Sequence, residues 1–66
     1  MNIIAADIRV EQGRAKMRVT LEDGSEQDTI AWFPDELTFT PADAIGRTVE
    51  ELRKLHFERD RAYLRS

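Results

Sequence analysis

Cysteine is absent from the 66 residues of this chain, and histidine occurs only once. The lack of cysteine excludes disulfides and thiolate zinc sites, and one histidine argues against a metal centre built from imidazoles. No apolar run approaches the roughly 18 residues that a membrane span needs. The start, MNIIAADIRV, has neither the basic residues nor the apolar run of a signal peptide. These absences predict a cytoplasmic protein that has no cofactor and no contact with a membrane.

An excess of charge of one sign is also missing. Charged residues make up 35% of the chain and leave a net charge of only −3, so whole-chain electrostatics do not favour nucleic acid as a partner. The chain is also short, and a domain of about 60 residues buries only about 60% of the surface that its unfolded form exposes. Small domains without disulfides or metals often gain stability from a partner subunit. We therefore expect one small domain over residues 1–66 that binds a second copy or another protein.

Apolar and polar side chains alternate through the first half of the chain, which is typical of strands with one buried face. This period of two predicts strands at about residues 3–10, 14–21 and 27–33. The side chains predicted to face the core are Ile4, Ala6, Ile8 and Val10 in the first strand and Ala15, Met17, Val19 and Leu21 in the second. Asp23-Gly24, between the second and third strands, predicts a type I′ turn. The third strand is partly apolar on both sides, so its pattern leaves the buried face undecided.

The segment after the third strand predicts a connector and a short helix. Pro34 ends the strand because proline has no backbone N–H for a ladder. Leu37 and Phe39 are predicted to anchor the connector to the core. Thr40 then caps a short helix at residues 41–45, whose first residue is a proline.

The last third of the chain predicts one long helix over residues 48–64. Thr48 and Glu51 form a capping box at its start, and apolar side chains recur at helical spacing after it. Those on the predicted sheet-facing side are Val49, Leu52, Leu55, Ala62 and Tyr63. A sheet of three strands needs such a cover for its apolar face. The sequence therefore predicts an α+β fold: a three-stranded antiparallel meander, a short helical turn, and one long C-terminal helix packed on the sheet.

Phe57 and Leu64 lie beside this stripe, one heptad apart, and widen the apolar arc beyond what one small sheet covers. Exposed apolar surface of this kind often marks an interface, so a two-fold homodimer through this side of the helix is predicted. Arg59, between Leu55 and Tyr63, then pairs with a carboxylate of the second copy. Two alternatives remain open. Instead of lying at a dimer interface, Phe57 packs on the connector of its own chain. Instead of pairing with a second copy, Arg59 lays its methylenes on apolar surface and places its charge at the rim.

Two further groups of residues have both a functional and a structural interpretation. Trp32, beside Phe33 and Pro34, is an interaction anchor if it is exposed and fills the core beneath the helix if it is buried. His56 and Asp60 can meet on one face of the long helix, but no nucleophile or third carboxylate accompanies them at diagnostic spacing. The pair is therefore interpreted as structural, and the protein is predicted not to be an enzyme.

Arg9, Lys16 and Arg18 fall on the solvent side of the first two strands and form an alternative site. A basic sheet face can bind phosphate backbones, which would make the protein a small nucleic-acid-associated accessory protein. These strands carry no aromatic side chains for base stacking, and several carboxylates lie close by in the sequence. They are Asp7, Glu22, Glu26 and Asp28. A salt-bridged solvent face is thus favoured over a nucleic-acid site.

The C-terminal half, WFPDELTFTPADAIGRTVEELRKLHFERDRAYLRS, resembles small uncharacterised proteins of phages and prophages. The resemblance is carried by WFP-DEL, by the helix start IG-R-T-VEE and by the closing RDRAYLRS. It implies a phage or prophage origin and a location in the bacterial cytoplasm, and it transfers no site residue. Together with the residue patterns, it predicts a non-enzymatic protein-interaction module whose partner is a second copy or a host or phage protein.

Overall fold

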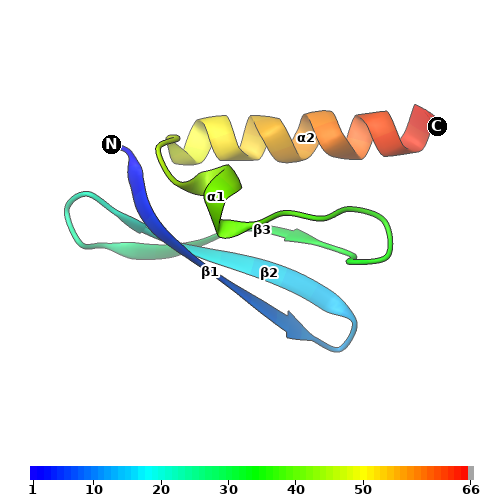
Figure 1. Ribbon diagram of the computed structural model, residues 1–66, viewed down its shortest axis with the longest axis horizontal. Helices are drawn as coiled ribbons and strands as arrows, with labels where there is room; N and C mark the ends of the chain where they lie inside the picture. The colour runs from blue at the N-terminus through cyan, green and yellow to red at the C-terminus, as the bar shows by residue number, and fades with distance from the viewer. Residues whose placement is uncertain (66) are drawn as a thin grey trace.

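A computed structural model of the protein describes residues 1–65 and has the α+β architecture that the sequence predicts. Along the chain the elements are β1 (Ile3–Glu11), β2 (Arg14–Leu21), β3 (Glu26–Trp32), α1 (Pro41–Ala44) and α2 (Val49–Arg65). The strands form an antiparallel meander in the order β1-β2-β3, and both helices lie on one side of it (Figure 1). None of the helices in residues 1–65 has the length and apolarity that a membrane crossing requires.

A two-residue turn at Gln12-Gly13 joins β1 and β2. Both residues have a positive φ, 53° and 76°, which is the conformation of a type I′ turn and suits the twist of the flanking strands. Glu11 and Arg14 form the closing pair, and the register continues without a break along β1 as far back as Ala5. This turn therefore sets which side chains of the two strands meet.

The turn between β2 and β3 differs from the predicted type I′ turn. Only Gly24 has a positive φ here, 87°, whereas a type I′ turn requires two such residues. The Gly24 N–H donates to the Leu21 carbonyl at 2.9 Å, and the Leu21 N–H donates to the Ser25 carbonyl at 2.8 Å. The carboxylate of Asp23 accepts hydrogen bonds from the hydroxyl and the backbone N–H of Ser25, which lower the pKa of Asp23. These bonds favour a three-residue loop that ends in a left-handed glycine.

An extra residue in β1 changes which side chains of that strand face the core. The register moves from Ile3 opposite Leu21 to Ala5 opposite Thr20, so Ile4 is the inserted residue of a β-bulge. Ile3 is buried and Ile4 is exposed. The prediction that Ile4 faces the core is wrong because the bulge reverses the alternation at this point.

A second bulge lies in β3 and settles which face of that strand is buried. Ile30 pairs with Met17, while Asp28 pairs with the next residue of β2, so Thr29 is the inserted residue. The Thr29 hydroxyl donates to the Met17 carbonyl at 3.1 Å. Ile30 and Trp32 face the core, and Trp32 is only 5% exposed. Trp32 is therefore a core residue, so of its two interpretations the structure supports the core and not the exposed interface anchor.

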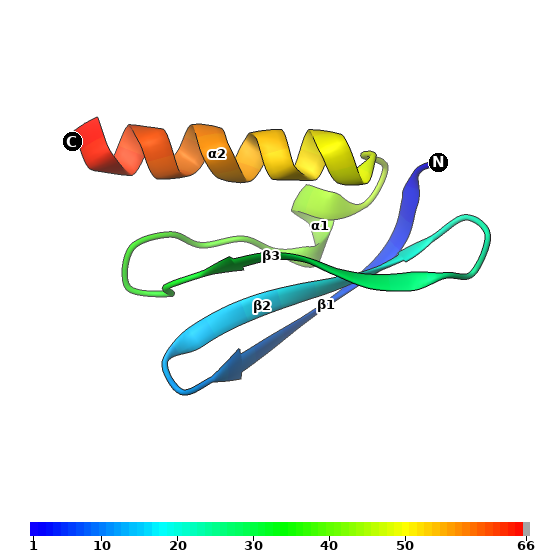
Figure 2. The ribbon, with the colours of Figure 1, turned by 180° about the vertical axis from the view of Figure 1, so that it is seen from behind.

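The hydrophobic core lies between the sheet, the connector and the two helices. Its buried side chains are Ile3, Ala15, Met17, Val19, Ile30, Trp32, Phe39, Ala44 and Leu52. Phe39 anchors the connector as predicted, with its ring centroid 4.9 Å from that of Trp32 and the two planes tilted by 60°. Seen from behind, α1 lies between the sheet and the start of α2 (Figure 2). It packs against β1 and α2, while α2 packs against β3.

The start of α2 follows the predicted capping box, and its end extends past the core. The Thr48 N–H donates to Glu51 Oε1 at 2.9 Å, and the Glu51 N–H donates to Thr48 Oγ1 at 3.1 Å. Leu52 is buried, whereas Ala62 and Tyr63 are exposed although they were predicted to face the sheet. Val49, Leu52 and Leu55 pack in or against the core, whereas residues 61–65 at the end of the helix are exposed.

Leu52→Ala is expected to lower the free energy of unfolding by about 2–5 kcal/mol, because truncation removes buried methyl groups and leaves a cavity. Urea unfolding followed by circular dichroism measures this change. Lys54→Ala, on the exposed side of the same helix, is the control and should have little effect. Equal unfolding midpoints for the two variants would show that the fold does not depend on the contact between α2 and the sheet.

Gly24→Val is expected to destabilise the protein by roughly 1–3 kcal/mol, because a β-branched side chain is strained at positive φ. Apart from Gly24 and its two chain neighbours, no described atom lies within 4 Å of a Cβ built at this position, so the cost comes from the backbone conformation. Gly24→Asn is the matched control, since asparagine tolerates the left-handed region. A valine variant that melts at the same temperature as the asparagine variant would contradict the turn described above.

Candidate interaction surfaces

The C-terminal half of α2 exposes two large apolar side chains on one side of the helix. Phe57 is 62% exposed and Leu64 is 73% exposed. One heptad separates them, so they differ by only about 20° around the helix axis. We call this pair the α2 stripe. The connector does not cover it, because Leu37 packs against the core instead.

Charged side chains surround the α2 stripe. Arg53 lies one turn before Phe57, and Arg61 lies one turn after it, beside Leu64. Both arginines are exposed, whereas Asp60, between the two apolar side chains, is half-buried. Lys54 and Glu50, the latter one heptad before Phe57, are also exposed on this side of α2, so the rim has three basic side chains and two carboxylates.

Arg59 forms its contacts within its own chain. Its Nη1 donates to the Thr38 carbonyl at 2.9 Å and to Asp43 Oδ2 at 3.1 Å, and its Nη2 donates to Asp43 Oδ1 at 3.2 Å. The guanidinium also lies over the ring of Phe39, 4.7 Å from the centroid. The prediction of a carboxylate partner in a second copy is therefore wrong. The true partner lies on α1, and helical spacing alone cannot identify a residue on another element.

The bidentate contact with Arg59 changes the ionisation of Asp43. The side-chain hydrogen bonds from Arg59 lower the pKa of Asp43, and the hydrogen bond from the Thr40 N–H lowers it further. The Thr40 N–H donates to Asp43 Oδ2 at 2.8 Å. Asp43 thus joins the start of α1 to the middle of α2 through one carboxylate.

A small pocket of about 140 Å³ lies between the end of β3 and α2. Its walls include Trp32, Phe33, His56 and Asp60. No hydrogen bond connects His56 with Asp60 in the part of the chain that the structure describes. Phe33 is exposed, and the guanidinium of Arg14 lies 5.8 Å from its ring centroid. Sequence analysis did not select Phe33, although the strand alternation places it on the face opposite Trp32.

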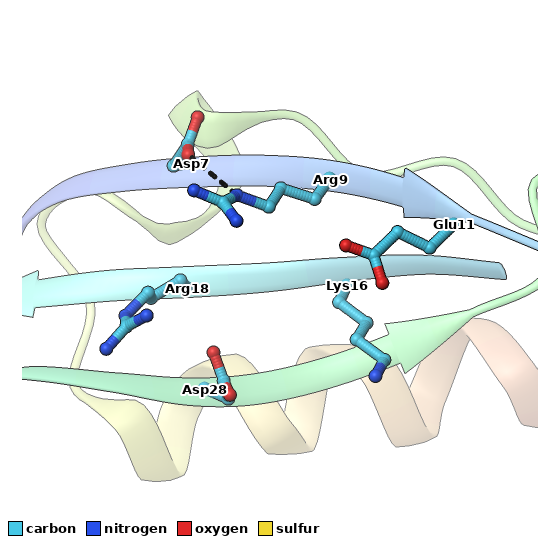
Figure 3. A pocket seen from close by; sticks show the side chains of 6 residues that line it. All are labelled: Asp7, Arg9, Glu11, Lys16, Arg18 and Asp28. Atoms are coloured by element: carbon cyan, nitrogen blue, oxygen red, sulfur yellow. Dashed lines mark ion pairs between the residues drawn. The ribbon is translucent and has the colours of Figure 1, made fainter.

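The outer face of the sheet brings Arg9, Lys16 and Arg18 together, as the alternative site requires. With three carboxylates they line a shallow pocket of about 170 Å³ (Figure 3). Arg9 lies opposite Lys16 in the β1–β2 register, and its Nε is 3.9 Å from Asp7 Oδ2. Arg18 lies between Asp7 and Asp28 on the neighbouring strands. Three cations and three carboxylates balance here, so the face lacks the excess positive charge that binds a phosphate backbone.

Comparisons with protein-family models, with curated proteins and with solved structures gave no match to this chain. Within residues 1–65, no three histidine or carboxylate side chains gather in a way that could hold a metal ion. The functional interpretation therefore depends on the two surfaces themselves. Of these, the α2 stripe has exposed apolar area, and the outer sheet face has balanced charge.

Asp43→Asn is expected to lower stability at neutral pH by at most about 1 kcal/mol, because Arg59 and Asp43 are both partly exposed, 36% and 24%. The folded pKa of Asp43 lies below the unfolded value, so its contribution is complete above the unfolded pKa and is lost as the pH falls through the folded pKa. Melting temperatures from pH 7 down to pH 2 measure the difference from wild type, which should shrink with acidification. Asp35→Asn, at an exposed turn position, is the control. A difference that is constant with pH would contradict this role of Asp43.

Proposed function

We propose that the protein is a non-enzymatic protein-interaction module of phage or prophage origin that binds a host or phage protein through the α2 stripe. The observation that carries this proposal is the exposure of Phe57 and Leu64, 62% and 73%, one heptad apart on the same side of α2. Helices that bind in grooves present apolar anchors at this spacing. The origin, and the bacterial cytoplasm as the place of action, rest on the resemblance of the C-terminal half.

The rim of the stripe supports a particular kind of partner. Arg53 and Arg61 lie on either side of Phe57, and both are exposed. A groove with apolar walls and carboxylates at its edge complements such a surface. We therefore propose a partner protein with an acidic, apolar groove.

α2 is anchored to the rest of the domain, so it is already folded before a partner binds. Leu52 is buried in the core, and Arg59 joins the middle of the helix to Asp43 and to the Thr38 carbonyl. The stripe is thus presented on a helix that is already ordered, so binding does not have to order the backbone. Phe57, as the aromatic member, is the expected energetic centre of the contact.

The non-enzymatic part of the proposal rests on the pocket beside α2. His56 and Asp60 both line it, but a general base needs a reacting proton and an orienting group within hydrogen-bond reach. The ring of His56 packs instead against Phe39, with 5.7 Å between centroids. This packing supports a structural role for the histidine.

Phe57→Glu is expected to abolish partner binding. It places a carboxylate in the apolar centre of the interface, opposite a partner groove whose edge carries carboxylates. The tagged protein is used to capture partners from bacterial lysate, and each captured protein is then titrated against purified wild type and variant. A true partner should bind Phe57→Ala at least about tenfold more weakly, the usual effect of removing a central anchor. Its affinity should also fall as salt is raised, because Arg53 and Arg61 lie at the rim.

Ala62→Glu is the matched control for this experiment. Ala62 is exposed on the same stretch of α2, but it lies on the side of the helix away from the stripe. This variant should keep the wild-type affinity. A captured protein that binds wild type, Phe57→Glu and Ala62→Glu equally well would exclude the α2 stripe as its binding site.

A further inference from the structure

The outer edge of β1 is open along most of its length. β1 is an edge strand, and within residues 1–65 only its first residue has a backbone partner on that side: the Ile3 N–H donates to the Arg47 carbonyl at 2.7 Å, and the Gly46 N–H donates to the Ile3 carbonyl at 2.9 Å. From Ala5 to Glu11, no strand of the described chain lies on the side of β1 away from β2 (Figures 1 and 3). An open, regular edge is a template for pairing with another strand.

The hairpin geometry determines which backbone groups point to this edge. A two-residue type I′ turn is closed by a hydrogen-bonded pair, which here is Glu11 and Arg14. Hydrogen-bonded and non-hydrogen-bonded pairs alternate along an antiparallel ladder. The backbone N–H and C=O groups of Ala6, Ile8 and Val10 therefore point away from β2, towards the open edge.

The side chains of the same three residues lie on the inner face, where cover is incomplete. Val10 is 62% exposed although it faces the side of the sheet on which the helices lie, and Ala6 and Ile8 are half-buried. The reason is that α2 packs over β3 and α1 packs near the start of β1, which leaves the distal half of β1 without a helix above it. This half of the strand thus combines an open edge with uncovered apolar side chains.

We infer that two copies of this chain associate by antiparallel pairing of their β1 strands, with the two-fold axis at Ile8. In this register Ile8 meets Ile8 of the second copy, and Ala6 meets Val10 of the second copy on each side of the axis. These three pairs exchange about six N–H···O bonds and cover the exposed Val10. The two sheets join into one continuous sheet of six strands through an isologous interface, in which both copies use the same residues.

The charges on the outer face select this register. Asp7 and Arg9 are exposed on that face of β1, and pairing about Ile8 places Asp7 opposite Arg9 of the second copy, twice. Moving the two-fold axis by one residue, to Asp7 or to Arg9, slips the two strands by two residues and places Asp7 opposite Asp7, or Arg9 opposite Arg9. Like charges directly opposite each other destabilise a sheet, and opposite charges stabilise it.

The other edge of the sheet is less suited to pairing. β3 contains the bulge at Thr29 in its middle, and Pro34 follows two residues after its end. Bulges and prolines interrupt the regular row of donors and acceptors that a second strand needs. β1 has its bulge at Ile4, outside the proposed contact. Self-association is therefore assigned to β1 and not to β3.

Analytical ultracentrifugation from about 1 to several hundred micromolar tests this pairing, a range that brackets weak dimers. The wild type should shift from the monomer mass of 7.7 kDa towards twice that mass. Asp7→Arg places two cations at the centre of β1, and Arg9→Asp places two anions there. Each variant alone should associate about tenfold more weakly than the wild type, because both central charge pairs become repulsive. An equimolar mixture of the two should form a mixed dimer with an affinity close to that of the wild type.

Val10→Lys provides a second test that does not alter the charge pairs. A lysine on the inner face of an edge strand blocks pairing, and the site is exposed enough to accept it in the monomer. The circular dichroism spectrum of Val10→Lys should therefore match that of the wild type, while its dimer is lost. Phe57→Glu, on the separate α2 stripe, is the control and should keep the dimer. Three results would overturn the inference. The wild type remains monomeric at all concentrations, the dimer is insensitive to Asp7→Arg and to Val10→Lys, or the dimer is lost only with Phe57→Glu. Because the two surfaces are tested by different variants, failure here leaves the proposed function of the α2 stripe intact.

Discussion

The packing of Phe39 is the contact on which the arrangement of the whole chain depends. Its ring lies against Trp32 at the end of β3 and against His56 of α2, with centroids 4.9 Å and 5.7 Å away. The guanidinium of Arg59 covers it from another side. One side chain of an irregular connector thus fixes the end of the sheet and the middle of the long helix relative to each other. The contact of Arg59 with Asp43 extends this link to α1.

Local sequence signals predicted most of the architecture because they depend only on neighbouring residues. The alternation in β2 placed Ala15, Met17 and Val19 in the core, where they are fully buried. The capping box at Thr48 and Glu51 marked the start of α2 to within one residue. In both cases a short pattern is sufficient, because a strand or a helix start is determined by the chemistry of a few adjacent side chains.

Apart from the turn at Asp23-Gly24, whose contacts are local, the features that sequence analysis missed depend on residues far away in the chain. The bulges at Ile4 and Thr29 exist only relative to the strand opposite, so no pattern within one strand reveals them. Arg59 was assigned to an interface because its partner on α1 could not be seen from helical spacing. The α2 stripe was predicted correctly as a pair of side chains beside the packing face, because the helix period alone determines their direction. Its exposure required the structure, which shows that α2 overhangs the sheet and that the connector turns inward.

The backbone contact of Ile3 with the loop at Gly46 and Arg47 links the beginning of the chain to the start of α2. More than half of the sequence lies between these residues, so this contact closes a long loop of the chain. Contacts of such long range slow folding and make it cooperative, because neither end of the molecule is complete without the other. The amide protons of Ile3 and Gly46 are the donors of this contact, so their exchange with solvent reports when it opens.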